Sequence, residues 1–216
     1  MQSLKYIFFV FCTCITTLSI AQKTFSEGTL VYNISVETGS KEPNMADMFD
    51  GATTTVYIKG SQSRSDMVSG LGSEITYLDN KTGKGVILKD YSGQKLMITL
   101  TKDDWDKKNK KYEGIKFEPT SESATIGGYS CKKVLATLGD GTSFIVYYAP
   151  DLISTNKDYN YQFKNLPGLA VQYEFVSGKK KFKYTLAQIT FDNVPSSKFE
   201  LPKSGYRMMT YDETKK

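Results

Sequence analysis

The chain has 216 residues, 24% of them charged, with a formal net charge of +5 and no histidine. This length supports one sizeable core, and the ordinary charged fraction argues against disorder. The lack of histidine excludes Ser-His-Asp and Cys-His catalytic arrangements, a histidine general base and mixed His/Cys zinc sites. The basic excess lies in scattered lysine-rich turns without an accompanying nucleic-acid motif, so we predict no nucleic-acid partner.

Residues 1–21 are typical of a secretory signal peptide. A single basic residue, Lys5, precedes the apolar run Tyr6–Ile15, and Ser19 and Ala21 place small residues where a signal peptidase needs them. The apolar run is too short to span a bilayer comfortably, and no other window approaches the required length. We therefore expect a periplasmic or secreted protein that is not integral to the membrane.

The cysteines offer an alternative for the same segment. Cys12 and Cys14 could be acylated as in a lipoprotein, but both lie inside the apolar run and neither follows a small residue. Cleavage after Ala21 removes both of them and leaves Cys131 without an intramolecular partner. Cys131 sits in an alternating segment, so we expect a small buried hydrophobe rather than a reactive thiol.

Residues 22–216 are predicted to form a single β-rich domain. Leu30, Tyr32, Ile34 and Val36 recur at every second position, which indicates a strand with one buried face. Similar alternation, bounded by tight turn sequences, predicts a meander of antiparallel strands. Further strands are expected at Thr53–Lys59, Arg64–Val68, Ile75–Asp79, Gly85–Lys89, Lys95–Thr101, Ser123–Leu138, Thr142–Tyr148, Leu169–Val176, Lys181–Phe191 and Lys198–Leu201.

Other segments interrupt the alternation. Lys41–Gly51 carries three large apolar residues at helical spacing and is predicted to form a short amphipathic helix or lid. Lys102–Lys111 surrounds the only tryptophan and is either a short helix or an exposed loop. Leu152–Phe163 has no clear periodicity and is expected to be a longer connection. The tail after Tyr206 should be poorly ordered unless something tethers it.

No cofactor, metal site or enzyme activity is predicted. The sequence has no Gly-rich phosphate loop of the Walker type and no dinucleotide fingerprint. Asp103, Asp104 and Asp106 are close enough in sequence to ligate calcium, but their spacing matches no EF-hand and lysines follow them, which favours a solvated turn. A carboxylate pair for glycoside hydrolysis converges in space rather than in sequence, and nothing here nominates one.

Two strands are more apolar than one buried face requires. Both faces of Thr142–Tyr148 are apolar, and Leu169, Val171, Tyr173 and Phe175 form one continuous apolar stripe. Such strands either fill an ordinary core or curve around a cavity that accepts an apolar ligand. Methionine is an adaptable lining for such a cavity, and the candidates are Met45, Met48, Met97, Met208 and Met209.

Three motifs occur in a fixed order. They are Ile126-Gly-Gly-Tyr-Ser-Cys-Lys-Lys133, Phe144-Ile-Val-Tyr-Tyr-Ala149 and Asn165-Leu-Pro-Gly-Leu-Ala-Val171. In this order they resemble the GLPGLI-type secreted proteins of the Bacteroides phylum and a related group of exported proteins of unknown function. Asn165 and Ala170 depart from the stricter GLPGLI pattern, so the chain is closer to the broader group.

The glycines in these motifs also have a physical interpretation. Pro167-Gly168 is a β-turn pair in which the glycine is expected to accept a positive φ, while Leu166 and Leu169 pin the turn to the core. Gly127-Gly128 would permit close backbone approach or a bulge before the following strand.

The resemblance implies the fold of periplasmic lipoprotein carriers such as LolA. That fold is mainly β with one or two short helices, and its strongly curved antiparallel sheet forms an incomplete barrel over an apolar cavity. The implied function is an exported, non-enzymatic binding protein that carries a lipid, an acyl chain or an apolar protein segment. The alternative is a structural or interaction module of the cell envelope, with an envelope protein as partner and no small-molecule ligand. For the carrier, the expected ligand contacts are Tyr32, Ile34, Met45, Met48, Phe49, Phe144, Val146, Val171 and Tyr173.

Overall fold

The computed structural model describes residues 22–37, 45–177 and 180–215, which contain twelve strands of one large sheet. These strands are β2 (Glu27–Glu37), β3 (Thr53–Lys59), β4 (Gln62–Ser69), β5 (Gly72–Asp79), β6 (Lys84–Tyr91), β7 (Gln94–Leu100), β8 (Lys116–Ile126), β9 (Tyr129–Thr137), β10 (Ser143–Ala149), β12 (Leu169–Ser177), β13 (Lys180–Thr190) and β14 (Arg207–Thr210).

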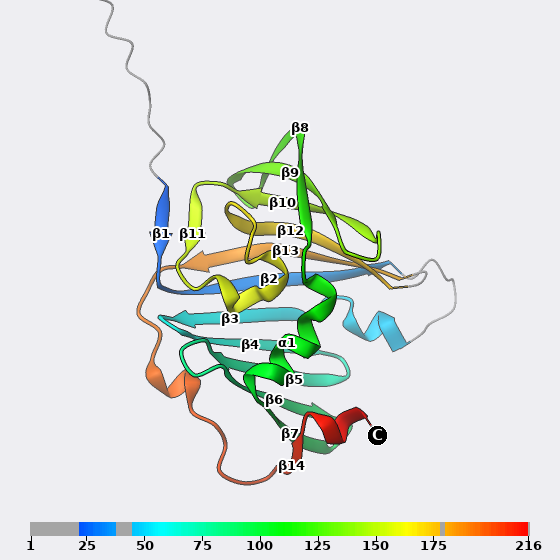
Figure 1. Ribbon diagram of the computed structural model, residues 1–216, viewed down its shortest axis with the longest axis vertical. Coiled ribbons are helices and arrows are strands. Elements are labelled where there is room, and N and C mark those ends of the chain that lie inside the picture. The colour runs from blue at the N-terminus through cyan, green and yellow to red at the C-terminus, as the bar shows by residue number, and fades with distance from the viewer. Residues whose placement is uncertain (1–21, 38–44, 178–179, 216) are drawn as a thin grey trace, which may run out of the picture.

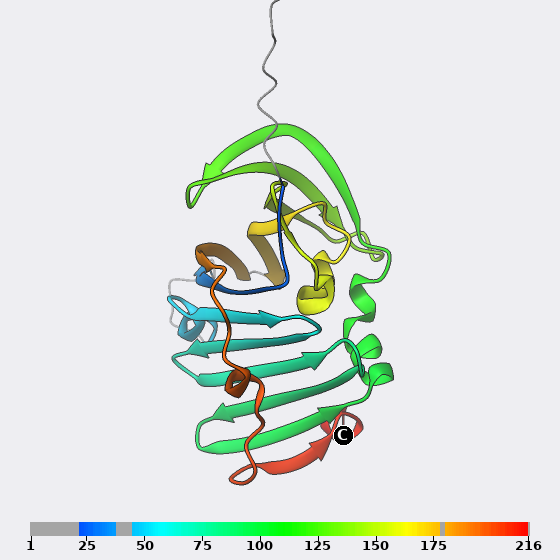
Figure 2. The same ribbon diagram turned by 90° about the vertical axis from the view of Figure 1, so that its left-hand side faces the viewer.

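The sheet is strongly curved and does not close into a barrel (Figures 1 and 2). Its strand order is β14-β7-β6-β5-β4-β3-β2-β13-β12-β10-β9-β8, so β14 and β8 form the two edges. All neighbours pair antiparallel except β14 and β7, which run parallel. The expectation of a mainly β fold built on a curved, open sheet is therefore confirmed.

An early strand, β2, and a late strand, β13, pair in the middle of this sheet. Strand β2 lies between β3 and β13, and its register with β13 runs from Thr29 opposite Thr190 to Glu37 opposite Lys181. The strands β3 to β7 form a meander on one side of this pair, and β8, β9, β10 and β12 form the more tightly curved half on the other side. The expected meander of sequential neighbours is present in β3–β7.

Helical segments are few and short. They are η1 (Met45–Phe49), α1 (Lys102–Asn109), η2 (Lys110–Tyr112), η3 (Lys157–Phe163), η4 (Ser196–Phe199) and η5 (Asp212–Lys215). A capping box begins α1: the Thr101 hydroxyl accepts the backbone N–H of Asp104, and the Asp104 carboxylate accepts that of Thr101. This box explains why the segment around Trp105 is a helix rather than an exposed loop. Within the described residues, no helix has the length and apolar character that crossing a bilayer requires.

Different segments cover the two faces of the sheet (Figure 2). On the concave face lie α1 and η3, whereas the chain between β13 and β14, including η4, crosses the opposite face. That crossing is fixed by hydrogen bonds from side chains of the sheet: Arg64 donates to the carbonyl of Lys198 at 2.7 Å, and Tyr77 to that of Glu200 at 3.4 Å. Among the described segments, α1 and η3 are therefore the ones that lie over the concave face.

Most of the core lies inside the tightly curved half. Leu30, Val134, Val146, Val171 and Leu186 are almost completely buried there. The meander has only small clusters on its two faces: one combines Tyr77, Leu88 and Met97 with the partly buried Tyr206, and the other combines Ile87, Ile98 and Leu100 with Trp105. This half of the sheet is thus stabilised mainly by the hydrogen bonds between its strands and by the segments that cross it.

The predicted strand Ser123–Leu138 is wrong, because two strands occupy it. Strands β8 and β9 form a hairpin whose turn is Gly127-Gly128, with φ of 58° and 84°. Two successive positive φ values define the tight turn that matches the twist of paired strands. The expected close approach is present: a Cβ added at Gly127 would lie 3.1 Å from the carbonyl oxygen of Leu186.

The chain after Phe191 also differs from the prediction. The expected strand Lys198–Leu201 is wrong, because the short helix η4 occupies its first residues. The tail after Tyr206, expected to be poorly ordered, pairs through β14 with the edge of β7, from Arg207 opposite Leu96 to Thr210 opposite Thr99. An edge strand offers unpaired backbone groups, and the tail satisfies those of β7.

The connection Leu152–Phe163 is more ordered than the sequence indicates. Its first residues form β11 (Leu152–Ser154), which pairs in parallel with β1 (Lys23–Phe25). Its remainder forms η3. The expected helix within Lys41–Gly51 corresponds to η1, while residues 41–44 lie outside the described residues.

Gly168 serves a different purpose from the predicted one. It is absent from the glycines with positive φ, so the expectation of a left-handed turn residue is wrong. A Cβ at this position would instead lie 2.3 Å from the carbonyl oxygen of Ala149. Leu166 and Leu169 are both 2% exposed, so the turn is pinned to the core as expected.

Candidate functional site

A groove with a volume of about 440 Å³ lies between the concave face of the sheet and the helical segments η2, η3 and α1. Strands β2, β3, β4, β5, β12 and β13 supply its floor. It exists because the sheet curves without closing, and because the helical segments stand over the floor rather than packing flat on it. Pockets for small ligands commonly measure about 300–1,000 Å³, so this groove has the size of a ligand site.

Aromatic side chains dominate the wall of the groove. Six tyrosines line it, together with Trp105 and Phe175, and the tyrosines are Tyr32, Tyr112, Tyr159, Tyr161, Tyr173 and Tyr184. Tyr173 stacks on Tyr184 with ring centroids 4.8 Å apart and an interplanar angle of 6°. Tyr32 meets the edge of Tyr173 at 6.1 Å. These contacts fuse side chains of β2, β12 and β13 into one continuous aromatic floor.

The aromatic surface continues to one end of the groove. Phe175 lies next to Phe182 with centroids 6.2 Å apart, and Phe182 lies at the same distance from Phe49 of η1. Phe175 is 37% exposed, and the ammonium group of Lys111 stands 5.1 Å from its ring centroid. This end therefore presents aromatic faces to solvent, partly covered by a cation.

Two tyrosines of the floor are buried in a way that fixes their protonation. The Tyr32 hydroxyl donates to the carbonyl of Ala170 at 2.8 Å, which ties β2 to the start of β12. Burial, followed by the neighbouring tyrosines, raises the pKa of both Tyr32 and Tyr173 well above the usual value of 10.0. A tyrosine is neutral at physiological pH in any case, and the raised pKa keeps both side chains uncharged into the alkaline range.

The part of the floor built by β3, β4 and β5 is more polar, although Val56 and Met67 also belong to it. Thr54, Ser65 and Thr76 of β3, β4 and β5 line it, and Glu74 contributes a carboxylate. Glu74 lies 3.4 Å from the ammonium group of Lys89 and accepts a long hydrogen bond from Tyr91. Burial and this carboxylate raise the pKa of Tyr91 to about 12. The groove thus has an aromatic side and a hydrogen-bonding side.

A second, polar pocket of about 420 Å³ adjoins the groove. Trp105 of α1 and Tyr161 of η3 line both spaces and form the boundary between them. The charged side chains that line this polar pocket are Lys102, Asp106, Glu113, Asp158 and Lys164.

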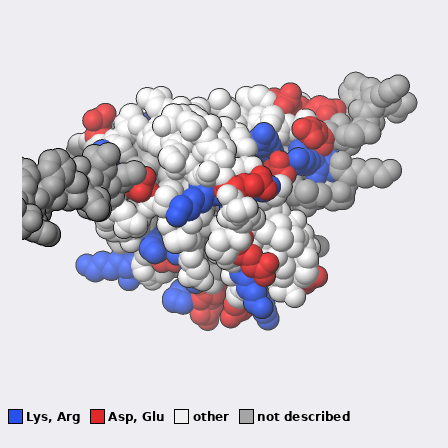
Figure 3. Space-filling view, turned by 90° about the horizontal axis from the view of Figure 1, so that it is seen from above, with Lys and Arg blue, Asp and Glu red and all other residues white. Residues whose placement is uncertain are grey.

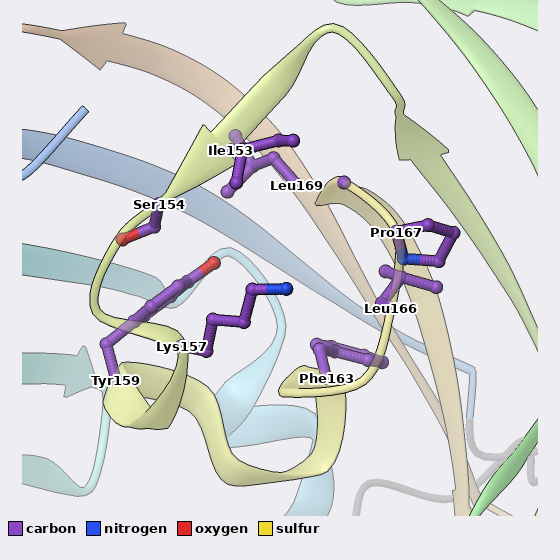
Figure 4. A pocket seen from close by; sticks show the side chains of 9 residues that line it. Ile153, Ser154, Lys157, Tyr159, Phe163, Leu166, Pro167 and Leu169 are labelled. Carbon is purple, nitrogen blue, oxygen red and sulfur yellow. The ribbon is translucent and has the colours of Figure 1, made fainter. Parts of the chain in front are cut away.

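A much smaller cavity lies between η3, β11 and the turn before β12 (Figure 4). Tyr159, Phe163, Leu166 and Leu169 project around it. Its volume of about 50 Å³ holds a few water molecules at most. It is therefore a packing gap behind η3 rather than a site for a ligand of any size.

The structure brings together only part of the predicted ligand-contact set. Tyr32 and Tyr173 lie on the floor of the groove. Ile34, Phe144, Val146 and Val171 are buried; the last three belong to the large core, as do Tyr32 and Tyr173, but they line no part of the groove. At the end of the groove, Phe49 contacts Phe182, while Met48 is 44% exposed beside Gly70. Met45 begins η1, and its side chain lies outside the described part of the chain.

Several groove residues were missed in the sequence. The tyrosines of η3 fall in a segment without periodicity, and Trp105 falls in a lysine-rich stretch that predicts a solvated surface. A signal was present in the run Tyr159-Asn-Tyr161, because two aromatic residues in a polar connection seldom serve a loop alone. The polar residues of β4 and β5 gave no signal, since they are normal on a half-exposed strand.

The acidic residues considered for calcium have structural tasks. Asp104 closes the capping box of α1, and Asp106 pairs with Lys102 at 2.7 Å. In the ranges that the structure describes, no group of three or more metal-ligating side chains comes together. Seen from the β8 end, basic and acidic side chains are interspersed around a large uncharged area rather than gathered into a patch of one sign (Figure 3).

No family model matches the chain, and no curated protein matches it either. The resemblance to GLPGLI-type proteins therefore stays a prediction. Solved structures do match. A crystal structure of PNGF-II aligns with a TM-score of 0.50 and 13% identity, over 88% of this chain and 33% of that one. The chain thus spans about a third of the length of PNGF-II.

Two further structures cover most of both chains. An uncharacterized conserved protein from Thermus thermophilus aligns with a TM-score of 0.51 and 7% identity, over 84% of this chain and 90% of that one. A LolA superfamily protein from Nitrosomonas europaea aligns with a TM-score of 0.34 and 8% identity, over 82% and 90%. At these identities, the similarity to PNGF-II and to the Thermus protein shows a shared fold and nothing about activity.

Proposed function

We propose that this chain is an exported, non-catalytic binding protein that holds the elongated apolar part of a ligand in the groove. The ligand part is an acyl chain or an apolar segment of a protein. One observation carries the proposal: an aromatic surface built from three strands, continuous with the core, lines an open volume of about 440 Å³. Aromatic rings gain free energy when an apolar ligand replaces the water on their faces.

The chemistry of the wall supports binding rather than catalysis. The sequence contains no histidine, and the carboxylate of the groove, Glu74, is engaged by Lys89 and Tyr91. Two converging carboxylates would be needed for a histidine-free hydrolase of the glycosidase kind. The aromatic floor, by contrast, offers a large neutral surface that can bind an apolar ligand without a catalytic group.

Export is proposed from the sequence. Residues 1–21 have the pattern of a cleaved signal peptide, which would deliver residues 22–216 to the periplasm or to the outside of the cell. An apolar molecule cannot cross an aqueous compartment unaided, because its hydration is unfavourable. A groove that shields such a molecule from water would allow this protein to carry it through that compartment.

Native mass spectrometry tests the proposal. Residues 22–216 are purified without detergent, and the protein is then extracted with organic solvent for lipid analysis. We expect a bound acyl-containing molecule at a ratio near one to one. A mass without ligand, unchanged after incubation with envelope lipids, would contradict the proposal.

A pair of variants ties the bound mass to the groove. Thr76→Trp adds a large side chain to the wall of the groove and should abolish the retained ligand. Thr125→Trp makes the same change on β8, at an exposed position that lines none of the pockets described above, and should retain it. Equal retention by both variants would place the ligand elsewhere.

The second candidate function is an interaction module of the cell envelope. It is favoured by β8, an edge strand of the sheet whose side chains are nearly all exposed. Such an edge can pair with a strand of another protein. This candidate predicts that a photoreactive side chain at Thr125 crosslinks to one defined envelope protein, and that the groove carries no ligand.

A further inference from the structure

The polar pocket beside the groove has a mixed set of hydrogen-bonding groups. Lys102 and Asp106 satisfy each other at 2.7 Å and do not require a ligand. Lys164 places its ammonium group 4.1 Å from the ring centroid of Tyr161, where donors remain available. Glu113 and Asp158 take part in none of the ion pairs formed by the described residues. The pocket therefore offers both donors and acceptors to a bound group.

Trp105 adds an unpaired donor at the boundary of the two spaces. Its indole nitrogen is shielded from solvent and finds no acceptor among the residues that the structure describes. A buried N–H without an acceptor is unfavourable, so the indole gains by turning toward an acceptor supplied from the pocket. The side chain lines both spaces, so either one borders the indole ring.

These groups discriminate among the polar ends that an amphipathic ligand can carry. A phosphate or carboxylate only accepts hydrogen bonds: it can pair with Lys164 and the Trp105 N–H, but Glu113 and Asp158 repel it and keep no donor of their own. An ammonium group only donates, so it leaves Lys164 and the Trp105 N–H without partners and repels the lysine. A hydroxyl donates and accepts, and several hydroxyls on one ring serve carboxylates, ammonium and indole together.

We propose that the polar pocket binds a saccharide group, and that the ligand of this protein is an amphipathic molecule with an apolar chain in the groove and a sugar in the polar pocket. This inference rests on the proposed function, because it assigns the second half of the same ligand. Trp105 and Tyr161 line both spaces, so the two spaces adjoin, as the two halves of one ligand require. Aromatic side chains at this boundary also suit a sugar, whose ring has an apolar face.

Three probes with the same alkyl chain separate the two halves of the ligand. Dodecyl maltoside, dodecylphosphocholine and dodecanoate are titrated below their micelle concentrations, and binding is followed by calorimetry and by the fluorescence of the only tryptophan, Trp105. We expect the maltoside to bind about tenfold more tightly than the other two, which corresponds to roughly 1.4 kcal/mol. The maltoside should also shift the tryptophan emission most.

The outcomes separate failure of the saccharide pocket from failure of the proposed function, the binding of an apolar chain in the groove. If none of the three probes binds, the proposed function fails and the inference fails with it. If all three bind with equal affinity, the groove binds alkyl chains but the saccharide pocket is wrong. Preference for either charged head group overturns the inference as well.

Variants then test whether the preference for the maltoside arises in the polar pocket. Glu113→Gln and Asp158→Asn remove one charge each and should reduce the preference for the maltoside several-fold, while the affinity for dodecanoate stays equal or rises. Trp105→Phe keeps a ring but removes the donor and should act in the same direction, with circular dichroism confirming the fold. Glu118→Gln, an exposed change on β8, is the matched control. A preference that survives all three pocket variants would overturn the assignment to this pocket.

Discussion

Glu27 accepts the backbone N–H of Val194 at 2.6 Å, while the ammonium group of Lys59 bonds both that carboxylate, at 3.1 Å, and the carbonyl of Val194, at 2.6 Å. Two neighbouring strands thus hold both backbone groups of one residue in the segment that leaves β13. Val194 is 2% exposed, so its side chain is buried at the same point. This clamp fixes the path by which the chain crosses the convex face toward η4.

The clamp predicts a specific dependence on acid. The Val194 N–H, followed by Lys59, lowers the pKa of Glu27 below its ordinary value of 4.5. A carboxyl with a lowered folded-state pKa contributes stability that is present above the unfolded pKa and is lost as the pH falls through the folded pKa. Glu27→Gln should therefore be less stable than the wild type near neutral pH and should lose less stability on acidification.

Thermal melts from about pH 7 to about pH 3 measure this difference. Glu118→Gln removes an exposed carboxylate from β8 and should follow the wild-type curve. Parallel curves for Glu27→Gln and the wild type would mean that the Glu27 carboxylate adds nothing to the stability.

The buried tyrosines of the floor predict that the protein also loses stability at alkaline pH. Burial raises the pKa of Tyr32 and of Tyr173 well above 10.0. Their contribution is complete below the unfolded pKa and is lost as the pH rises, because the unfolded chain ionises first. Denaturant unfolding should therefore show falling stability above about pH 10. Tyr32→Phe should flatten this fall, and at neutral pH it should cost about 1–3 kcal/mol by leaving the Ala170 carbonyl unpaired.

Gly168 predicts a sharp steric effect. A Cβ there would lie 2.3 Å from a backbone carbonyl and 2.8 Å from the ring of Tyr148, so Gly168→Ala forces backbone movement. We expect a loss of about 1–3 kcal/mol in the free energy of unfolding. Gly139→Ala is the control, because nothing lies within 4 Å of its added Cβ and its change should stay within about 0.5 kcal/mol. A similar loss for both variants would point to general glycine flexibility instead.

Cys131 predicts protection of its thiol. The side chain is 1% exposed, its sulfur donates weakly to the Tyr129 carbonyl, and burial raises the pKa of the thiol. A thiol-specific reagent should therefore label native residues 22–216 orders of magnitude more slowly than the unfolded chain. Rapid labelling of native protein would show that the hairpin of β8 and β9 opens readily, and the denatured sample gives the reference rate.

The strands that alternate with period two were the predictable part of this fold. Thr53–Lys59 was predicted with its observed boundaries, because Val56 and Ile58 face the core while their neighbours are only half-buried. The hairpin at Gly127-Gly128 was missed although a Gly-Gly pair is a hairpin signal, because the exposed strand β8 has no apolar alternation that would mark it as a strand of its own. The pairing of the tail with β7 depends on an edge that is left open far away in the sequence.

The candidate site was less predictable for the same reason. Tyr32 and Tyr173 were identified because they stand on apolar faces of regular strands. Val146 and Val171 stand on equally apolar faces but lie in the filled half of the sheet, and the pattern carries no information on where the curvature leaves space. Trp105, Tyr159 and Tyr161 reach the groove from helical segments whose placement over the sheet is a tertiary property.

The central position of β2 also sets the order in which the chain can assemble. During synthesis, β3 to β7 can pair with their neighbours as soon as each strand emerges, since every partner is adjacent in sequence. Strand β2 emerges before all of them, yet its second partner, β13, is nearly the last strand to be made. The large core beside this pair therefore cannot close until almost the whole chain exists. If residues 1–21 direct export as proposed, this delay would keep the chain extended for longer before it crosses the membrane.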